Sequence, residues 1–170
     1  LSIVKQLAEL MGGEVGVAST PGQGSDFWVV LPLEIADEVS AAAPAQADLA
    51  AIRVLVVDDS PVNLLVCQNI LARAGAEVSL ATDGREAVEK LRADPAAFDV
   101  VLMDVHMPVL DGNAATRLIR GELGLVALPV IALTASALVA ERLRAFEAGM
   151  NDCVSKPFDA EVLMRTVRRC

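Results

Sequence analysis

Short apolar runs alternate with longer amphipathic stretches from residue 52 to the end of the chain. Runs of this kind are typical of buried β-strands, and they occur at 53–57, 98–103, 129–133 and 152–155. A less apolar run at 76–80 predicts an edge strand. The stretches between them have helical periodicity and end at helix-stopping residues such as Gly75 and Gly149.

Five strand–helix units in succession predict a topology as well as a set of elements. Connections between parallel strands are right-handed, so helices must cover both faces of the sheet. The most apolar strands, at 53–57, 98–103 and 129–133, belong at its centre. We therefore predict an α/β fold with a five-stranded parallel sheet of order 2-1-3-4-5.

The first 33 residues have a different pattern. Apolar residues at 3, 4, 7 and 10 have helical spacing, and glycines follow at 12 and 13. Two strand-like segments, 14–18 and 26–31, flank the glycine-rich turn at 21–24. A hairpin turn needs such glycines for its backbone conformation, so we favour a helix and hairpin over a phosphate-binding loop.

Small residues, one proline and four acids fill positions 34–51 and predict a linker without a core of its own. The sequence therefore divides into an N-terminal piece at 1–33, a linker at 34–51 and a complete domain at 52–170. The first residue is not Met, which predicts a fragment or a processed chain.

Composition excludes several classes of function. The chain has a net charge of −9 and no basic block, which argues against nucleic-acid binding. It has no apolar run near the ~20 residues of a membrane span, so we expect no direct membrane contact. Cys67, Cys153 and Cys170 are scattered and odd in number, which predicts a reduced, cytoplasmic protein. With His106 as the only histidine and no CxxC, a zinc site is not expected.

Five polar residues stand where the predicted strands end: Asp58, Asp59, Asp104, Thr134 and Lys156. The carboxyl ends of parallel strands share one edge of a sheet, so these side chains should converge there. Carboxylates this close repel one another, and a hard cation with oxygen ligands, such as Mg²⁺, relieves the repulsion.

This set suits an aspartate that accepts a phosphoryl group. Asp104 ends the central strand and is the candidate nucleophile, with Lys156 and Thr134 placed to pair with the phosphate. A structural alternative remains open, in which Asp58 and Asp59 cap the following helix and Lys156 forms an ordinary ion pair.

The motifs around these residues resemble the response-regulator receiver domain, across residues 52–170. They are Val57-Asp58-Asp59-Ser60, Met103-Asp104-Val105-His106-Met107-Pro108, Leu110-Asp111-Gly112, Leu133-Thr134-Ala135 and Ser155-Lys156-Pro157. The resemblance implies a flavodoxin-like fold. It implies that Asp104 is the phosphorylated residue, Thr134 the switch hydroxyl and Lys156 the phosphate partner.

The resemblance also implies a metal site and a special peptide bond. Mg²⁺ would be bound by Asp59, Asp104 and the backbone carbonyl of His106, with Asp58 acting through water. The Lys156–Pro157 bond would be cis. One position departs from the family: Cys153 stands where an aromatic ring usually follows the motion of the switch threonine, so a large output rearrangement is not implied.

The N-terminal piece is similar to the tail of the ATP-binding domain of histidine kinases. The similar segments are Leu1 to Gly13, Pro21 to Ser25 and Phe27-Trp28. The two matches in this order resemble a hybrid sensor histidine kinase. The boxes that bind ATP and a donor histidine on a dimerisation helix are missing from this sequence, so we expect no autokinase activity.

These observations predict a phosphoacceptor in a two-component phosphorelay. It would take its phosphoryl group from a histidine-phosphotransfer protein or from the kinase's own phosphohistidine domain. Two alternatives stay open. One is a degenerate receiver that acts only as an interaction module, and the other is a phosphatase with an aspartyl-phosphate intermediate, a class that needs Asp-x-Asp after its first strand.

The helix at 61–74 offers a candidate docking surface. We assign its inward stripe to Val66, Cys67, Ile70, Leu71 and Ala74. Leu64 and Leu65 then fall near the opposite side, beside the rim of the acidic pocket. Two adjacent exposed leucines there would favour contact with a phosphotransfer partner.

Overall fold

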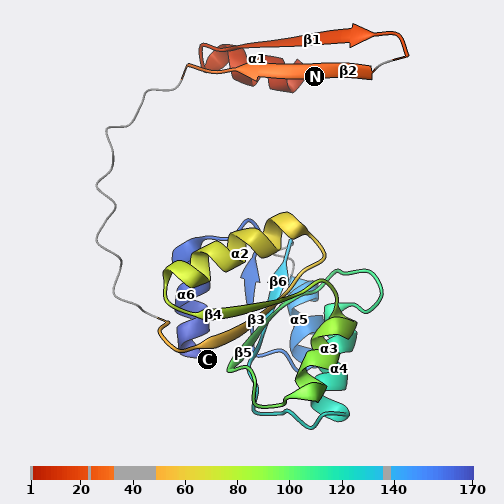
Figure 1. The fold of residues 1–170 in the computed structure, drawn as a ribbon, viewed down its shortest axis with the longest axis vertical. Coiled ribbons are helices and arrows are strands. Elements are labelled where there is room, and N and C mark those ends of the chain that lie inside the picture. The colour runs from red at the N-terminus through yellow and green to blue at the C-terminus, as the bar shows by residue number, and fades with distance from the viewer. Residues whose placement is uncertain (1, 23, 33–48, 136–138) are drawn as a thin grey trace. The chain divides into compact units, whose positions relative to one another are not determined.

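The computed structural model describes residues 2–22, 24–32, 49–135 and 139–170. They form two compact units (Figure 1). The first holds α1 (Ser2–Leu10), β1 (Glu14–Thr20) and β2 (Gly24–Val30). The second holds the remaining strands and helices. Within the described residues, no helix is both long enough and apolar enough to span a bilayer.

The second unit is built on a parallel sheet of five strands. Its strands are β3 (Arg53–Val57), β4 (Glu77–Ala81), β5 (Val100–Asp104), β6 (Val130–Thr134) and β7 (Asp152–Ser155). They lie in the order β4-β3-β5-β6-β7, which confirms the predicted order 2-1-3-4-5. All of β5 and β6 is buried, and the less apolar β4 is an edge, because the central strands are covered on both faces.

In the described residues a helix follows each of these strands, and every helix but the last leads to the next strand: α2 (Pro61–Arg73), α3 (Gly84–Ala93), α4 (Gly112–Gly121), α5 (Val139–Glu147) and α6 (Ala160–Arg169). Four of these helices have an N-cap residue whose side chain accepts hydrogen bonds from backbone N–H groups that lack a partner within the helix. These caps are Ser60, Asp83, Asp111 and Asp159.

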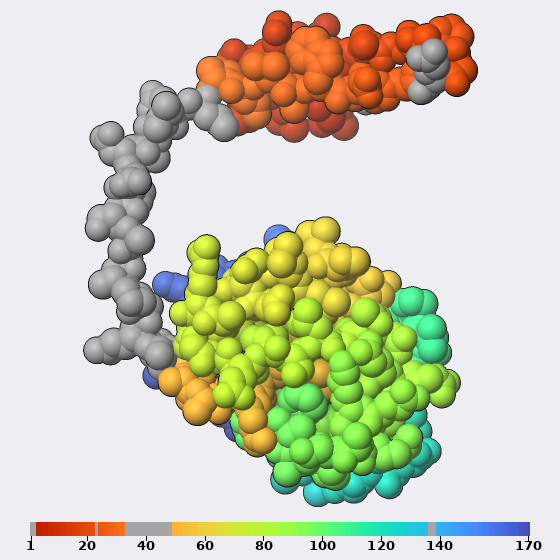
Figure 2. All heavy atoms as spheres, viewed as in Figure 1, coloured from red at the N-terminus to blue at the C-terminus, as the bar shows by residue number. Residues whose placement is uncertain are grey.

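The helices form two layers. In Figure 1, α2 and α6 lie on one face of the sheet, and α3, α4 and α5 lie on the other. Alternate residues of each strand face opposite layers, so Val54 and Val56 pack with α2 and α6, whereas Leu55 and Val57 pack with the other three helices. Figure 2 shows the side chains of this unit closely filled on the visible face.

The predicted orientation of α2 is wrong by about one position. Leu64 is only 7% exposed and packs in the layer with Cys67 and Leu71, whereas Val66 is 39% exposed. Residues 64, 67 and 71 are three and four apart and therefore share one face of a helix. The exposed apolar side chains at the start of α2 are Val62, Leu65 and Val66, called the α2 patch below.

The folded unit also begins earlier than residue 52. Leu49 has no exposed surface, and its backbone N–H donates to the carbonyl of Ala74 at 3.0 Å. It packs beneath α2 because it is the one large apolar side chain among the small residues at 47–51. Positions 34–48 of the predicted linker lie outside the described residues.

The first unit has the predicted helix and hairpin. β1 and β2 pair antiparallel from Glu14 opposite Val30 to Thr20 opposite Gly24. Gly22, at a φ of 82°, and Gly24, at 103°, have the left-handed backbone that the turn requires. Figure 2 shows this unit as a narrow, elongated body.

Candidate functional site

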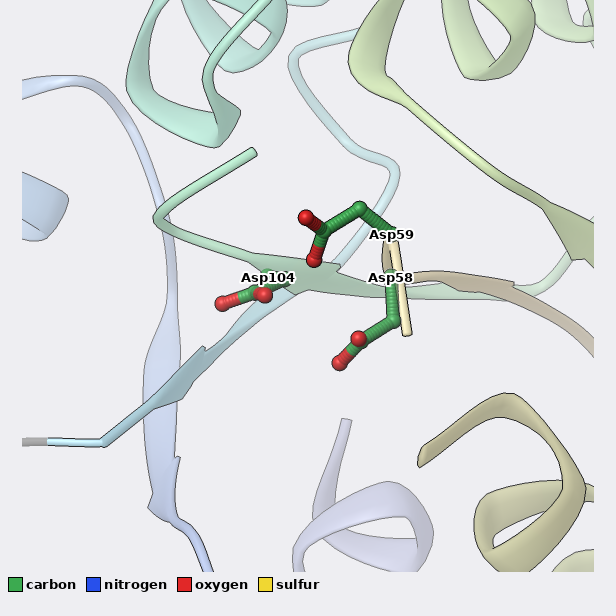
Figure 3. A group of neighbouring side chains, drawn as sticks. All are labelled: Asp58, Asp59 and Asp104. Atoms are coloured by element: carbon green, nitrogen blue, oxygen red, sulfur yellow. The ribbon is translucent and has the colours of Figure 1, made fainter. Parts of the chain in front are cut away.

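Three carboxylates meet beyond the ends of β3 and β5 (Figure 3). Asp58 and Asp59 follow β3, and Asp104 is the last residue of β5. One oxygen from each lies within 4.8 Å of the others. Asp58 and Asp104 are buried and Asp59 is exposed, so the cluster opens to solvent on one side.

Lys156 joins the two buried acids. Its Nζ lies 2.6 Å from Asp58 Oδ2 and 2.8 Å from Asp104 Oδ2. Lys156 follows β7, and its backbone N–H donates to the carbonyl of Thr134 at 2.7 Å. The Lys156–Pro157 bond is cis, as the resemblance implied. The ammonium is thus fixed between the two carboxylates rather than paired at the surface.

The pKa values of this group reflect two opposing effects. Burial raises the pKa of Asp104 above its ordinary value, and the hydrogen bond from Lys156 offsets only part of that increase. Burial alone would lower the pKa of Lys156, but hydrogen bonds to Asp104 and Asp58 raise it above its ordinary value. The lysine therefore stays charged at neutral pH.

Asp58 is held by two further donors. Asn63 Nδ2 donates to its Oδ1 at 3.0 Å and to its Oδ2 at 3.2 Å, and the backbone N–H of Ser60 donates to Oδ1 at 2.9 Å. The N-cap of α2 is Ser60, so the predicted alternative in which Asp58 and Asp59 cap the helix is wrong. Sequence reasoning missed Asn63, although its place in the first turn of α2 was a usable signal.

Asp104 has close backbone support. The N–H of His106 donates to its Oδ1 at 3.3 Å. Gly112, at the start of α4, lies directly behind it: a Cβ there would meet the carbonyl oxygen of Asp104 at 2.1 Å. A glycine is therefore required for the loop to close over the end of β5. The imidazole of His106 is 65% exposed at the rim.

Thr134 ends β6 and is buried. Its strand pairs with β5 so that Leu133 lies opposite Asp104. The Thr134 hydroxyl donates to Glu141 Oε2 at 3.0 Å, and Glu141 Oε1 lies 3.9 Å from His106 Nε2. Glu141 belongs to the first turn of α5 and was not among the predicted site residues.

The structure brings together Asp58, Asp59, Asp104 and Lys156, and it places Thr134 at the end of the neighbouring strand β6. Three carboxylates against one ammonium leave the cluster with an excess of negative charge, and oxygen donors are the ligands that Mg²⁺ prefers. The donor set therefore fits a magnesium ion. Cys153, at the usual aromatic position, is half-buried against the layer of α3, α4 and α5.

Comparison with known proteins agrees with this geometry. The family model for the response regulator receiver domain matches residues 54–168. The chain belongs to the response-regulator receiver family. A second model, for the histidine kinase-, DNA gyrase B- and HSP90-like ATPase, matches residues 1–35. The receiver is therefore preceded by a segment of the ATPase family.

A curated relative aligns with nearly the whole of this chain. The sensor histidine kinase AruS of Pseudomonas aeruginosa is 39% identical over 98% of this chain. The chain spans only 17% of the length of that kinase. This chain is thus similar to the receiver region of a sensor kinase, and such receivers belong to two-component phosphorelays.

Two solved receivers have the same fold. The receiver domain of the sensor histidine kinase PA1611 of Pseudomonas aeruginosa has a TM-score of 0.64 and 42% identity, covering 71% of this chain and 97% of that chain, and carries a magnesium ion in its active-site cleft. The Saccharomyces cerevisiae receiver of Ssk1, crystallised with the histidine phosphotransfer protein Ypd1, has a TM-score of 0.65 and 26% identity, covering 70% and 88% of the respective chains.

Proposed function

We propose that this receiver accepts a phosphoryl group on Asp104 from a phosphohistidine, with Mg²⁺ bound by Asp58, Asp59, Asp104 and the backbone carbonyl of His106. The observation that carries the proposal is the position of Lys156, whose ammonium touches both buried carboxylates. A cation at this point can form an ion pair with the phosphoryl oxygens once Asp104 carries the phosphate.

Transfer exchanges one bond to phosphorus for another. A carboxylate oxygen of Asp104 attacks in line, the N–P bond of the phosphohistidine breaks, and its electron pair stays on the imidazole nitrogen. Mg²⁺, when bound, neutralises charge on the phosphoryl oxygens. Lys156 pairs with the new phosphate, and Asn63 and Ser60 keep Asp58 in place.

The α2 patch is the proposed docking surface for the phosphohistidine partner. It lies in the first turns of α2, directly after Asp58 and Asp59, and its side chains are 68%, 57% and 39% exposed. A partner of the histidine-phosphotransfer kind, or the kinase's own phosphohistidine domain, needs an apolar contact there to align its imidazole. We also propose a cytoplasmic location, in keeping with three unpaired cysteines.

Labelling of Asp104 tests the acceptor role. Acetyl phosphate with Mg²⁺ should add one phosphoryl group, which mass spectrometry should map to Asp104, and Asp104→Asn should remove it. Labelling that survives Asp104→Asn would refute the proposal. Labelled ATP alone should leave the chain unlabelled. Persistent aspartyl phosphate, without turnover of a phosphomonoester, separates this function from the phosphatase alternative, and any labelling separates it from a passive interaction module.

The docking surface needs two donors for its test. Val62→Ser with Leu65→Ser should slow transfer from a phosphorylated partner, whereas labelling by acetyl phosphate should stay the same because the pocket is intact. Equal effects on both donors would place the change in the pocket. Val126→Ser is the matched control and should slow neither donor. Val126 is 72% exposed and lies in the loop before β6, outside the α2 patch.

A further inference from the structure

Glu141 connects α5 to the rim of the phosphorylation site. One of its carboxylate oxygens accepts the hydroxyl of Thr134 at 3.0 Å, and the other lies 3.9 Å from His106 Nε2. Its side chain is only 21% exposed, against 65% for His106. The Glu141 carboxylate is therefore held in one position by its partners, unlike a fully exposed side chain that moves freely in solvent.

The residue whose hydroxyl Glu141 holds ends the strand beside the one that carries the phosphoryl acceptor. Leu133 lies opposite Asp104 in the sheet, so Thr134 is one residue beyond it on a strand ~4.8 Å away. The backbone of Thr134 is fixed by its strand and by the N–H of Lys156, which donates to its carbonyl at 2.7 Å. A change of acceptor for the hydroxyl therefore needs a turn of the side chain rather than of the strand.

We propose that Glu141 is a positioning residue that competes with the phosphoryl group on Asp104 for the hydroxyl of Thr134. The proposal rests on the proposed function. A hydroxyl has one proton and donates to one acceptor at a time. A phosphoryl group brings three strong acceptor oxygens and a charge of about −1.5 to −2, which attracts the hydroxyl and repels the Glu141 carboxylate.

This competition gives phosphorylation a direct route to α5. Glu141 lies in the first turn of α5, so loss of its bond to Thr134 removes a contact that ties this end of the helix to the sheet. At the position where the resemblance implies an aromatic ring, this chain has Cys153, which is too small to follow Thr134. Glu141 therefore carries the link in this receiver, and α5 is the element that responds.

Beryllofluoride with Mg²⁺, a stable phosphoryl mimic, tests the competition. Glu141→Ala in the full chain should bind it about fivefold more tightly, as expected for the loss of one competing hydrogen bond. The α5 amide NMR signals of the unliganded variant should move toward their positions in the liganded wild type. Glu141→Gln, which keeps an acceptor oxygen, should fall between the two. Glu147→Ala, which removes an exposed acid from the same helix, is the matched control.

A second background shows whether the effect passes through Thr134. In Thr134→Val there is no hydroxyl to compete for, so adding Glu141→Ala should change the affinity by less than about twofold. Equal tightening in both backgrounds, unchanged affinity in Glu141→Ala, or weaker binding would each overturn the proposal. A wild-type chain that neither binds beryllofluoride nor is labelled by acetyl phosphate would instead refute the phosphoacceptor function.

Discussion

The two units of this chain have equally regular secondary structure but very different interiors. Two internal strands of the receiver, β5 and β6, are buried along their whole length. Among the described residues of the first unit, Ala8 is the only buried apolar side chain, while ten large apolar side chains are exposed: Ile3, Val4, Leu7, Leu10, Met11, Val17, Phe27, Trp28, Val29 and Val30. The local pattern therefore predicts a helix and a hairpin, but burying a large core needs a sheet covered on both faces.

Separating the units is the strongest test of this contrast. Residues 49–170 alone should unfold cooperatively with the same midpoint as the full chain and should label equally with acetyl phosphate. A peptide of residues 1–33 should show an unfolded circular dichroism spectrum, because so small a two-layer unit cannot bury enough apolar surface. A folded peptide, or a receiver that unfolds without residues 1–33, would contradict the comparison.

Much of the receiver could be predicted from its sequence because its signals are strong. Short apolar strands and punctuating glycines determine the strand order, and strand ends determine where Asp58, Asp104 and Lys156 converge. The orientation of α2 could not be predicted in the same way, because apolar residues surround its first turns. Val62, Leu64, Leu65 and Val66 leave several faces almost equally apolar, and only packing on the sheet selects one.

Residues that act through another side chain were also beyond sequence reasoning. Glu141 and Thr134 are seven positions apart and meet through the angle at which α5 leaves the sheet, which no local pattern encodes. Leu49 falls within the predicted linker because its neighbours are small, but its large apolar side chain is fully buried. Tertiary contacts, rather than propensity, decide such positions.

Neighbouring leucines of α2 test the contrast between core and surface within the receiver. Leu64→Ala should lower the free energy of unfolding by about 2–5 kcal/mol, because it leaves a cavity in a closed core. Leu65→Ala should change it by less than about 0.5 kcal/mol. Urea unfolding measures both. Leu7→Ala in the first unit should leave the receiver's transition where it is, and a shift there would show that the units share a core.

Magnesium should stabilise the receiver but not the first unit. At about ten times its dissociation constant, Mg²⁺ should add ~1.4 kcal/mol to the free energy of unfolding, since it binds only the folded cluster. Asp59→Asn should remove most of this gain. Asp26→Asn, which removes an exposed acid from β2, should keep it. Thermal unfolding with Mg²⁺ or with EDTA checks the effect, and an equal gain in both variants would mean non-specific ion binding.

The smallest expected effect concerns pH and the start of α3. Glu86 accepts from Lys90 and from the backbone of Thr82, and these bonds lower the pKa of Glu86 to about 2. A lowered pKa stabilises the folded state above the ordinary value near 4.5, and the gain disappears as the pH falls toward 2. Glu86→Gln should therefore cost less than about 1 kcal/mol at pH 7 and almost nothing at pH 2.

Urea unfolding of this variant at both pH values gives the difference directly. Glu89→Gln, which removes an exposed acid from the same helix, is the control for the loss of one negative charge. A cost for Glu86→Gln that persists unchanged at pH 2 would mean that shape, rather than charge, matters at this position.

Ser60 has a consequence for how this receiver tolerates change. Ser60 caps α2, so the helix does not need the side chain of the neighbouring Asp59 for its stability. Asp59 is exposed and belongs to the carboxylate cluster. Ser60 thus stabilises the fold, and the adjacent Asp59 serves the phosphorylation site. In a library of variants sorted only for solubility, position 59 should accept many residues, whereas sorting for phosphorylation should return aspartate.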